Sequence, residues 1–284
     1  MKLGAGTYAW SAAGYGMEDA LREIAALGIR YVDMLGCDHG HPGVLTAVKR
    51  KDIARIIDDH DLHISSILAL YDGNIASALS RERADILDYM HRIFDLCGEF
   101  AADQILYKPG DKIIGLPHDA AWENSVAFTR KTADMARGYG VLITFELVPR
   151  PFALVQTIAE MERMLDDVGC ENVFANLDLG HVALVRDSAA DCARIAPCTV
   201  HLHLNDNDTY VHTNDVVGSG SVPMEAYVAA VCKNGAEGTC ASLGIPLVAG
   251  IEIELTEDTA GKTPAEITRM SRDYVRDHLP SITI

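Results

Sequence analysis

The chain has 284 residues, of which 49% are hydrophobic and 23% are charged, and its formal net charge is −17. This length is enough for one large α/β domain or two ordinary domains with an ample core. The negative charge would repel nucleic-acid phosphates and anionic membranes, and the 24 Lys and Arg residues form no basic run. We therefore expect no nucleic-acid partner.

The cysteines and the N-terminus indicate the cellular compartment in which the protein is expected. Seven cysteines occur singly, with no C-x-x-C pair, which fits a reducing environment. Residues 1–6 run straight into a folded pattern and lack the apolar core of a signal peptide. No stretch has the apolar length needed to span a bilayer. These features predict a cytoplasmic protein with no membrane partner, which could form a homo-oligomer.

Short apolar runs alternate with segments of helical periodicity along the whole chain. Runs rich in Val, Ile and Leu that are bounded by turn residues predict buried strands. The predicted strands cover residues 3–9, 29–35, 62–70, 103–107, 141–145, 173–177, 199–202 and 247–251. The predicted helices cover residues 17–27, 46–60, 81–99, 117–139, 157–168, 187–195, 223–232 and 263–278.

This alternation predicts the fold class. Eight strand–helix pairs without a linker or a break in composition favour a parallel sheet, and in this length they fit an α/β fold of the (β/α)₈ TIM-barrel type. We expect one domain over residues 1–284. A doubly wound open sheet is the alternative, but polar residues end the last four strands alike rather than clustering at one crossover.

Four polar residues stand at or just past the ends of those last strands: Glu146, Asp178, His203 and Glu252. The carboxyl ends of parallel strands meet at one end of a barrel, so these side chains should converge. Three carboxylates and one imidazole suit a single divalent ion such as Mn²⁺, Mg²⁺, Co²⁺ or Zn²⁺. A structural salt bridge is the alternative role of Glu146. Glu254 shares a strand face with Glu252, so spacing leaves the ligand open between them.

Two motifs strengthen the hypothesis of a metal site. In Asp178-Leu179-Gly180-His181, the Asp and the His can face one pocket across a Gly turn. In His201-Leu202-His203, alternate residues of a strand share a face. A lone strand histidine is more often a core residue, but the Asp178–His181 motif favours a ligand role for His203.

Other candidates carry less specific signals. Several polar residues lie at predicted strand ends, where each is equally compatible with an ordinary loop: His39, His41, Lys108, Arg150 and Asp33. Gly218-Ser219-Gly220 suggests a phosphate-binding loop, but it lacks a following Lys-Ser/Thr and reads more simply as a surface turn.

With these residues in place, the chain resembles the sugar isomerase/epimerase superfamily of xylose isomerase-like TIM barrels. The resemblance covers nearly the whole length. It rests on Leu27–Asp33, Phe145-Glu146, Asp178–His181, His203–Asp206, Gly218–Val222 and Gly244–Glu252. The last of these segments aligns in a way that favours Glu252 over Glu254 as the ligand.

The resemblance implies residue roles. In relatives the metal is held by the residues equivalent to Glu146, Asp178, His203 and Glu252, while His181 contacts substrate. In the ketose 3-epimerase branch, the two Glu ligands also exchange the substrate proton. This sequence departs from that branch, because Phe152 replaces a further Glu and no Arg follows within residues 205–220. Arg150 and His212 are candidate replacements, and His39 and Lys108 are further candidates for binding substrate.

We therefore expect a metal-dependent isomerase or epimerase that acts on a ketose or related polyol-ketone, such as a cyclitol derivative, through an enediolate. Glu146 and Glu252 would be its acid/base residues. A dehydratase of inosose or dehydroshikimate type is the alternative on the same barrel. An endonuclease IV-like hydrolase is disfavoured by the acidic charge and by Tyr107-Lys108-Pro109-Gly110, where a His-Pro-Gly is expected. A non-catalytic sugar-binding barrel should lack the complete ligand set.

Overall fold

A computed structural model describes residues 1–36, 47–256 and 259–284. Its parallel strands pair in sequence order, and the last pairs with the first, so that the barrel is closed. They are β1 (Lys2–Gly6), β2 (Tyr31–Leu35), β3 (His63–Leu68), β4 (Gln104–Tyr107), β5 (Leu142–Glu146), β6 (Val173–Asp178), β7 (Thr199–Leu204) and β8 (Val248–Ile251). The predicted TIM barrel is confirmed.

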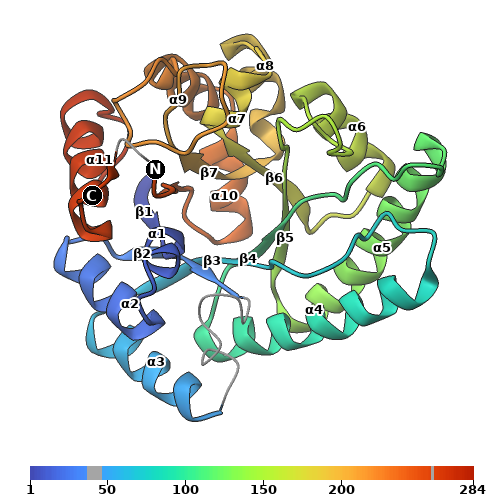
Figure 1. Cartoon of the computed structure of the whole chain (residues 1–284), viewed down its shortest axis with the longest axis horizontal. Coiled ribbons are helices and arrows are strands. Elements are labelled where there is room, and N and C mark those ends of the chain that lie inside the picture. Colours follow the sequence, from blue (N-terminus) through green and yellow to red (C-terminus); the bar gives the residue numbers. More distant parts are fainter. Residues whose placement is uncertain (37–46, 257–258) are drawn as a thin grey trace.

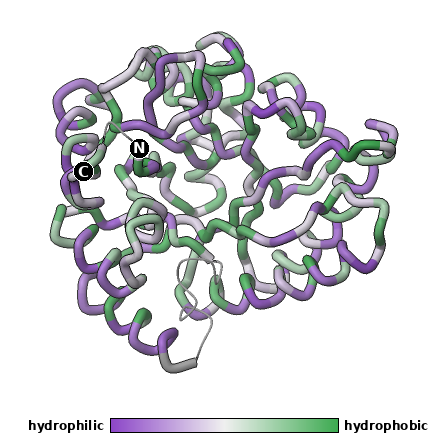
Figure 2. The backbone as a smooth tube through the Cα atoms, in the orientation of Figure 1, coloured by the Kyte–Doolittle hydropathy of each residue, from purple (hydrophilic) through white to green (hydrophobic). Residues whose placement is uncertain are grey.

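Helices surround the barrel (Figure 1). They are α1 (Tyr8–Ala12), α2 (Met17–Ala26), α3 (Ala47–Asp59), α4 (Ser80–Phe100), α5 (His118–Tyr139), α6 (Ile158–Val168), α7 (Leu179–Leu184), α8 (Ala189–Ile195), α9 (Met224–Lys233), α10 (Ala236–Leu243) and α11 (Pro264–His278), with a 3₁₀ turn at Ala196–Cys198. Hydrophobic and hydrophilic residues alternate along the outer helices (Figure 2), as expected for helices with one face on the barrel. None of the helices formed by the described residues combines the length and the hydrophobicity of a membrane-spanning segment.

The helix boundaries follow from local chemistry. The Thr157 and Thr263 side chains each accept the backbone N–H of a Glu three residues on, in capping boxes that begin α6 and α11. Pro264 at the first position of α11 has a fixed φ that suits a helix start. Gly140 and Gly169 end α5 and α6 in the left-handed conformation, which glycine adopts without strain.

Three helices differ from the sequence-based expectations. The first strand ends at Gly6 rather than Ala9, and Tyr8–Ala12 is helical, with Trp10 fully buried and donating from Nε1 to Glu23 at 2.7 Å. Helix α10 lies in the segment expected to be a Gly-rich loop. Helix α7 follows β6 at once, because the Asp178 side chain caps it. The expected cap Thr46 lies outside the described residues.

Strand β7 contains one residue more than its partner β6 in the paired region. Ala175 pairs with Thr199, but the next residue, Asn176, pairs with His201, so Val200 has no counterpart. This bulge places Asp178 directly beside His203 in the ladder. Two polar residues expected at separate strand ends therefore stand at the same height.

Gly250 of β8 leaves space inside the barrel that another side chain would fill. A Cβ at this position would lie 1.8 Å from Asp33 Oδ2 and 3.5 Å from His201 Nε2. We expect Gly250→Ala to destabilise the protein by about 1–3 kcal/mol through overpacking, as measured by urea unfolding. Gly238→Ala in α10 is the control, because its Cβ would meet nothing within 4 Å and should stabilise the helix slightly. Equal unfolding midpoints for the two variants would contradict this account.

Candidate metal centre and active-site pocket

The structure brings together the four residues predicted to bind a metal. Glu146 and Asp178 are the last residues of β5 and β6, His203 lies in β7, and Glu252 directly follows β8. Each offers one ligand atom, and these four atoms all lie within 4.8 Å of one another. Ligands about 2.1 Å from a shared ion are separated by up to about 4.2 Å, so modest adjustment would suit one cation.

A network of hydrogen bonds fixes these side chains. His203 Nδ1 lies 2.8 Å from Glu146 Oε1 and 2.9 Å from Glu252 Oε2. Asn176 Nδ2 donates to Glu146 Oε1 at 2.7 Å, and Asn205 Nδ2 donates to Asp178 Oδ2 at 2.6 Å. The two amides, which the sequence did not mark as site residues, orient the carboxylates.

The site concentrates negative charge in a buried place. Burial raises the pKa of Asp178 to about 6, and the charges of Glu146 and Glu252 add to this rise. Burial alone would lower the pKa of His203, but the charges and hydrogen bonds of Glu252 and Glu146 hold it well above its usual value. The pKa of Glu146 is lowered, because its hydrogen bond to His203 and the charge of that residue outweigh burial.

These observations fit a divalent cation. Three carboxylates share one imidazole, and Asp178 and His203 are fully buried. Like charges held this closely are stabilised by a counter-charge at their centre. Oxygen-rich sets with one imidazole suit Mn²⁺, Mg²⁺, Co²⁺ or Zn²⁺, and the donor set alone does not choose among them.

Metal binding should release protons. At pH 7 the metal-free His203 carries a proton that must leave before Nδ1 can bind an ion, so about one proton should be released per ion. Below about pH 6 Asp178 also binds a proton, so the affinity should fall more steeply as the pH decreases through this value. Calorimetric titration with Mn²⁺ in buffers of different ionisation enthalpy measures the released protons. A pH-independent affinity between pH 5 and 8 would contradict this prediction.

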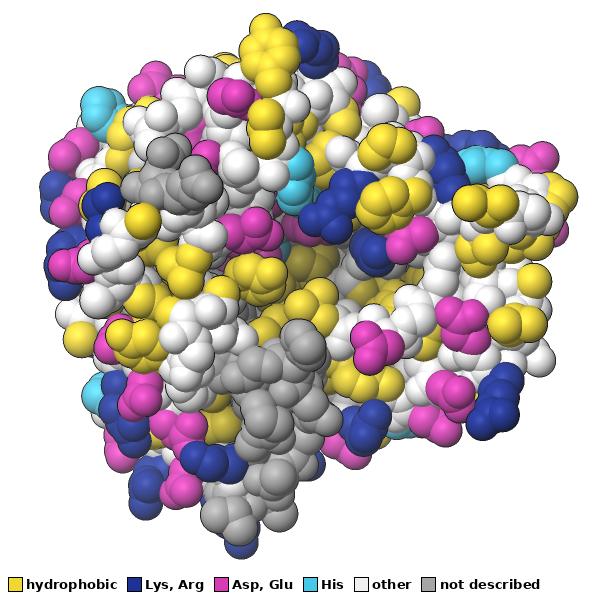
Figure 3. All heavy atoms as spheres, viewed as in Figure 1, with side chains coloured by type: hydrophobic (Ala, Val, Ile, Leu, Met, Phe, Trp, Pro, Cys, Tyr) yellow, Lys and Arg dark blue, Asp and Glu magenta, His cyan; other side chains and the backbone are white. Residues whose placement is uncertain are grey.

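A cavity of about 350 Å³ opens beside the cluster, within the usual range for small-molecule sites. Figure 3 shows the hollow at the centre of the molecule, with acidic, basic and histidine side chains along one side and hydrophobic side chains elsewhere. The side chains of Glu146 and Glu252 are 15% and 13% exposed and line the cavity. The cluster therefore has two fully buried members and two that face the pocket.

His181 and His212 form a pair on the pocket wall. The Nε2 atoms of the two rings lie 2.8 Å apart, and His181 Nδ1 donates to the Leu147 carbonyl at 2.9 Å. Burial and the positive charges of His181 and Arg150 lower the pKa of His212 to about 4. Although burial opposes it, the charges of Asp178, Glu146 and Glu252 raise the pKa of His181. His212 is thus neutral near pH 7, and the two rings share one hydrogen bond between their Nε2 atoms.

The remaining candidates divide into three groups. Lys108 and Arg150 line the cavity, and Lys108 Nζ donates to Asp111 Oδ2 at 2.6 Å. Glu254 also lines the cavity, but it is not part of the cluster of ligand atoms among the described residues. His39 and His41 lie outside the described residues.

A comparison of the sequence with protein families bears on this arrangement. Residues 21–274 match the Xylose isomerase-like TIM barrel family. The chain belongs to this family. The closed parallel barrel and its candidate metal cluster are in keeping with that membership. No curated protein matches the chain by sequence.

Solved structures resemble this xylose isomerase-like barrel over nearly its whole length. The IolI protein with a bound zinc atom has a TM-score of 0.82 at 18% identity, covering 99% of each chain. An L-ribulose 3-epimerase has a TM-score of 0.78 at 19% identity, covering 99% of this chain and 95% of its own. The D-psicose 3-epimerase from Clostridium cellulolyticum H10 with D-tagatose has a TM-score of 0.79 at 16% identity, covering 98% and 99%. At these identities the likeness shows the fold.

Proposed function

We propose that the protein is a divalent-metal-dependent isomerase or epimerase of a ketose or related polyol-ketone. The observation that carries this proposal is the division of the cluster into two buried residues, Asp178 and His203, and two that line the cavity, Glu146 and Glu252. The buried pair can hold an ion but does not line the cavity, whereas the two glutamates can hold the ion and also touch a substrate. A zinc-bound protein and two sugar epimerases among the structural neighbours support it.

A bound divalent ion would polarise the substrate carbonyl and stabilise the negative charge of the enediolate. The residues of the chain would transfer the protons. Glu146 and Glu252 extend from different strands, β5 and the end of β8, so one carboxylate can remove a proton from carbon and the other can return one. Return to the opposite face of the same carbon gives an epimer, and return to the adjacent carbon gives an aldose–ketose isomer.

The other pocket residues would bind and orient the substrate. His181 lines the cavity, and its ring is fixed by the hydrogen bond from Nδ1 to the Leu147 carbonyl. Lys108 and Arg150 supply further donors to the polar side of the pocket. Leu68 and Leu106 provide apolar contact area. Such a pocket would hold a small polyhydroxylated molecule with its carbonyl towards the cluster.

The proposed function is tested by the exchange of substrate protons with deuterium from the solvent. The Mn²⁺-loaded protein is incubated in D₂O with a panel of ketoses, inososes and keto acids, and the products are followed by NMR. Deuterium on the carbon next to the carbonyl, in recovered substrate or in an isomer, is the expected result, and its position separates an epimerase from an isomerase. Loss of water from one compound would make the protein a dehydratase. Absence of exchange across the panel with metal bound would count against the proposed chemistry.

A further inference from the structure

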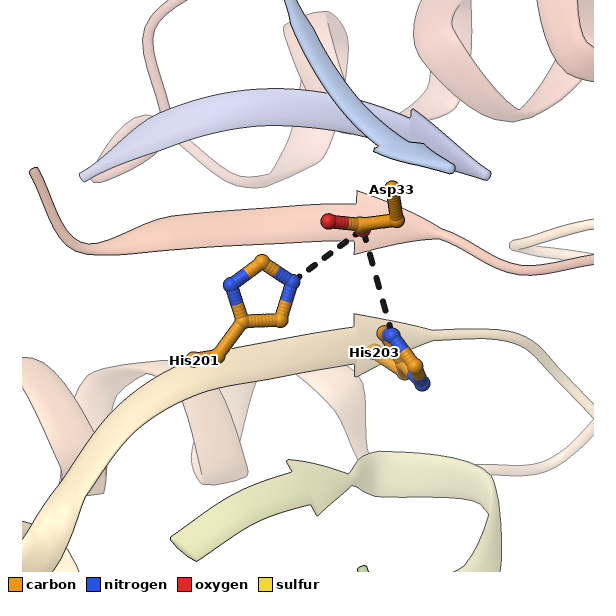
Figure 4. Close-up of side chains that lie close together, drawn as sticks. All are labelled: Asp33, His201 and His203. Carbon is orange, nitrogen blue, oxygen red and sulfur yellow. Dashed lines mark hydrogen bonds and ion pairs between the residues drawn. The ribbon is translucent and has the colours of Figure 1, made fainter. Parts of the chain in front are cut away.

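A second buried polar cluster lies inside the barrel, below the candidate metal site. It contains Asp33 from β2 and His201 and His203 from β7, whose side chains are at most 2% exposed. Asp33 Oδ2 lies 3.1 Å from His201 Nε2 and 3.9 Å from His203 Nε2 (Figure 4). The two imidazole rings are nearly perpendicular, with centroids 5.5 Å apart. One carboxylate oxygen thus faces both histidines.

The barrel is built to hold the Asp33 carboxylate in this place. Gly250 stands beside His203 in the ladder, and a Cβ there would collide with Asp33 Oδ2. Ser65 is the extra residue in a register shift between β2 and β3, and its hydroxyl lies 2.7 Å from Asp33 Oδ1. The glycine makes room for the carboxylate and the serine fixes its other oxygen.

The two ring nitrogens of His203 face different groups. Nδ1 faces Glu146 and Glu252 in the metal cluster. Nε2 is buried and has no hydrogen-bond partner among the described residues. A nitrogen that binds a metal carries no proton, so a neutral His203 bound through Nδ1 must carry its proton on Nε2. A buried N–H requires an acceptor, and the Asp33 carboxylate is the charged group that this nitrogen faces.

We propose that Asp33 is the positioning carboxylate of the metal site, which accepts the Nε2–H of His203 and so presents Nδ1 to the ion. The inference rests on the proposed metal dependence and extends it to a residue that touches neither metal nor substrate. The separation of 3.9 Å exceeds a hydrogen bond, so the contact must shorten when the ion binds. A carboxylate in this position fixes the tautomer and orientation of a metal-bound histidine.

The test measures metal affinity in an Asp33→Asn variant. This change keeps the shape of the side chain but removes its charge, and the affinity for Zn²⁺, measured by competition with a chromophoric chelator, should fall by about 10–100-fold. Asp103→Asn is the matched control, because Asp103 Oδ2 pairs with His63 Nε2 at 2.6 Å where β3 and β4 begin. It should bind Zn²⁺ as tightly as the original protein. Equal affinity in Asp33→Asn and Asp103→Asn would overturn the proposal.

A second measurement needs no variant and applies even if Asp33→Asn fails to fold. In the Zn²⁺-loaded original protein, long-range ¹H–¹⁵N spectra identify which ring nitrogen of His203 carries the proton. We expect the Nε2–H tautomer with a proton shifted downfield by a hydrogen bond. Metal bound through Nε2, or two Zn²⁺ ions per chain with one between Asp33 and the histidines, would overturn the proposal. Failure of the original protein to bind Zn²⁺ would instead count against the proposed function.

Discussion

Replacing Glu252 by Gln is expected to reduce the rate of solvent deuterium exchange by about 10²–10⁴-fold, the usual contribution of a positioned acid/base group. The side chain keeps its length, but the amide cannot accept a proton from carbon, and it is a weaker metal ligand. Glu252 faces both His203 and the cavity, so both effects should follow from one change. NMR exchange rates at saturating Mn²⁺, together with metal content, separate the two effects.

Glu254→Gln is the matched control. Glu254 lies two residues further along the chain and lines the same cavity, and burial together with the charge of Glu252 raises its pKa. Its carboxylate is outside the cluster of four ligand atoms. The metal content of Glu254→Gln should therefore equal that of the original protein. If Glu252→Gln exchanged deuterium at the original rate while Glu254→Gln did not, the assignment of these two residues would have to be reversed.

Removing the metal is expected to lower the stability of the whole protein. An ion that binds only the folded state, present at 100 times its Kd, stabilises it by about 2.7 kcal/mol. In a chain of this size that corresponds to a change in Tm of about 4–5 °C. The effect should be seen because, without an ion, the three carboxylates of Asp178, Glu146 and Glu252 are offset by the histidines His203 and His181 alone among the described residues of the cluster and its wall. Thermal unfolding with EDTA and with added Mn²⁺ measures it.

The control for this effect is a protein without the imidazole ligand. In His203→Gln the difference in Tm between Mn²⁺ and EDTA should be smaller than in the original protein, because the cluster then lacks its nitrogen donor. A shift in Tm as large as that of the original protein would mean that the ion binds elsewhere. Asp178→Asn provides an independent check of whether the shift in Tm with Mn²⁺ comes from this cluster. This residue is fully buried and lines no part of the cavity.

The barrel and the converging side chains could be predicted because each depends on local sequence. A buried strand and the polar residue that ends it are neighbours in the chain, as with Phe145 and Glu146. Parallel topology then brings such ends together without further information. The order of the strands therefore predicted where Glu146, Asp178, His203 and Glu252 would meet, and the structure places their ligand atoms within 4.8 Å.

The features that could not be predicted depend on distant or dual-purpose residues. Asp33 and His201 are 168 positions apart, and no local pattern pairs them. Asp178 belongs to the ligand cluster and also caps the N-terminus of α7. Its position in the sequence indicated a ligand, and the helix that it caps was not predicted. Gly235, Gly238 and Gly244 suggested a loop, but burial of Ala236 and Cys240 holds α10 in place. The supporting amides of Asn176 and Asn205 carry no distinctive spacing.

The unmatched Val200 in β7 has a consequence for evolution and for protein engineering. A strand advances by about 3.3 Å per residue and alternates its side chains between two faces. If β7 kept Val200 but paired evenly with β6 from Ala175–Thr199 onward, Val200 would stand beside Asn176 and Leu202 beside Asp178, and the imidazole of His203 would turn towards the outer helices. A barrel with the same four residue types in the same order would then have no site for an ion. Copying these residues with their present spacing onto another barrel therefore requires copying this bulge as well.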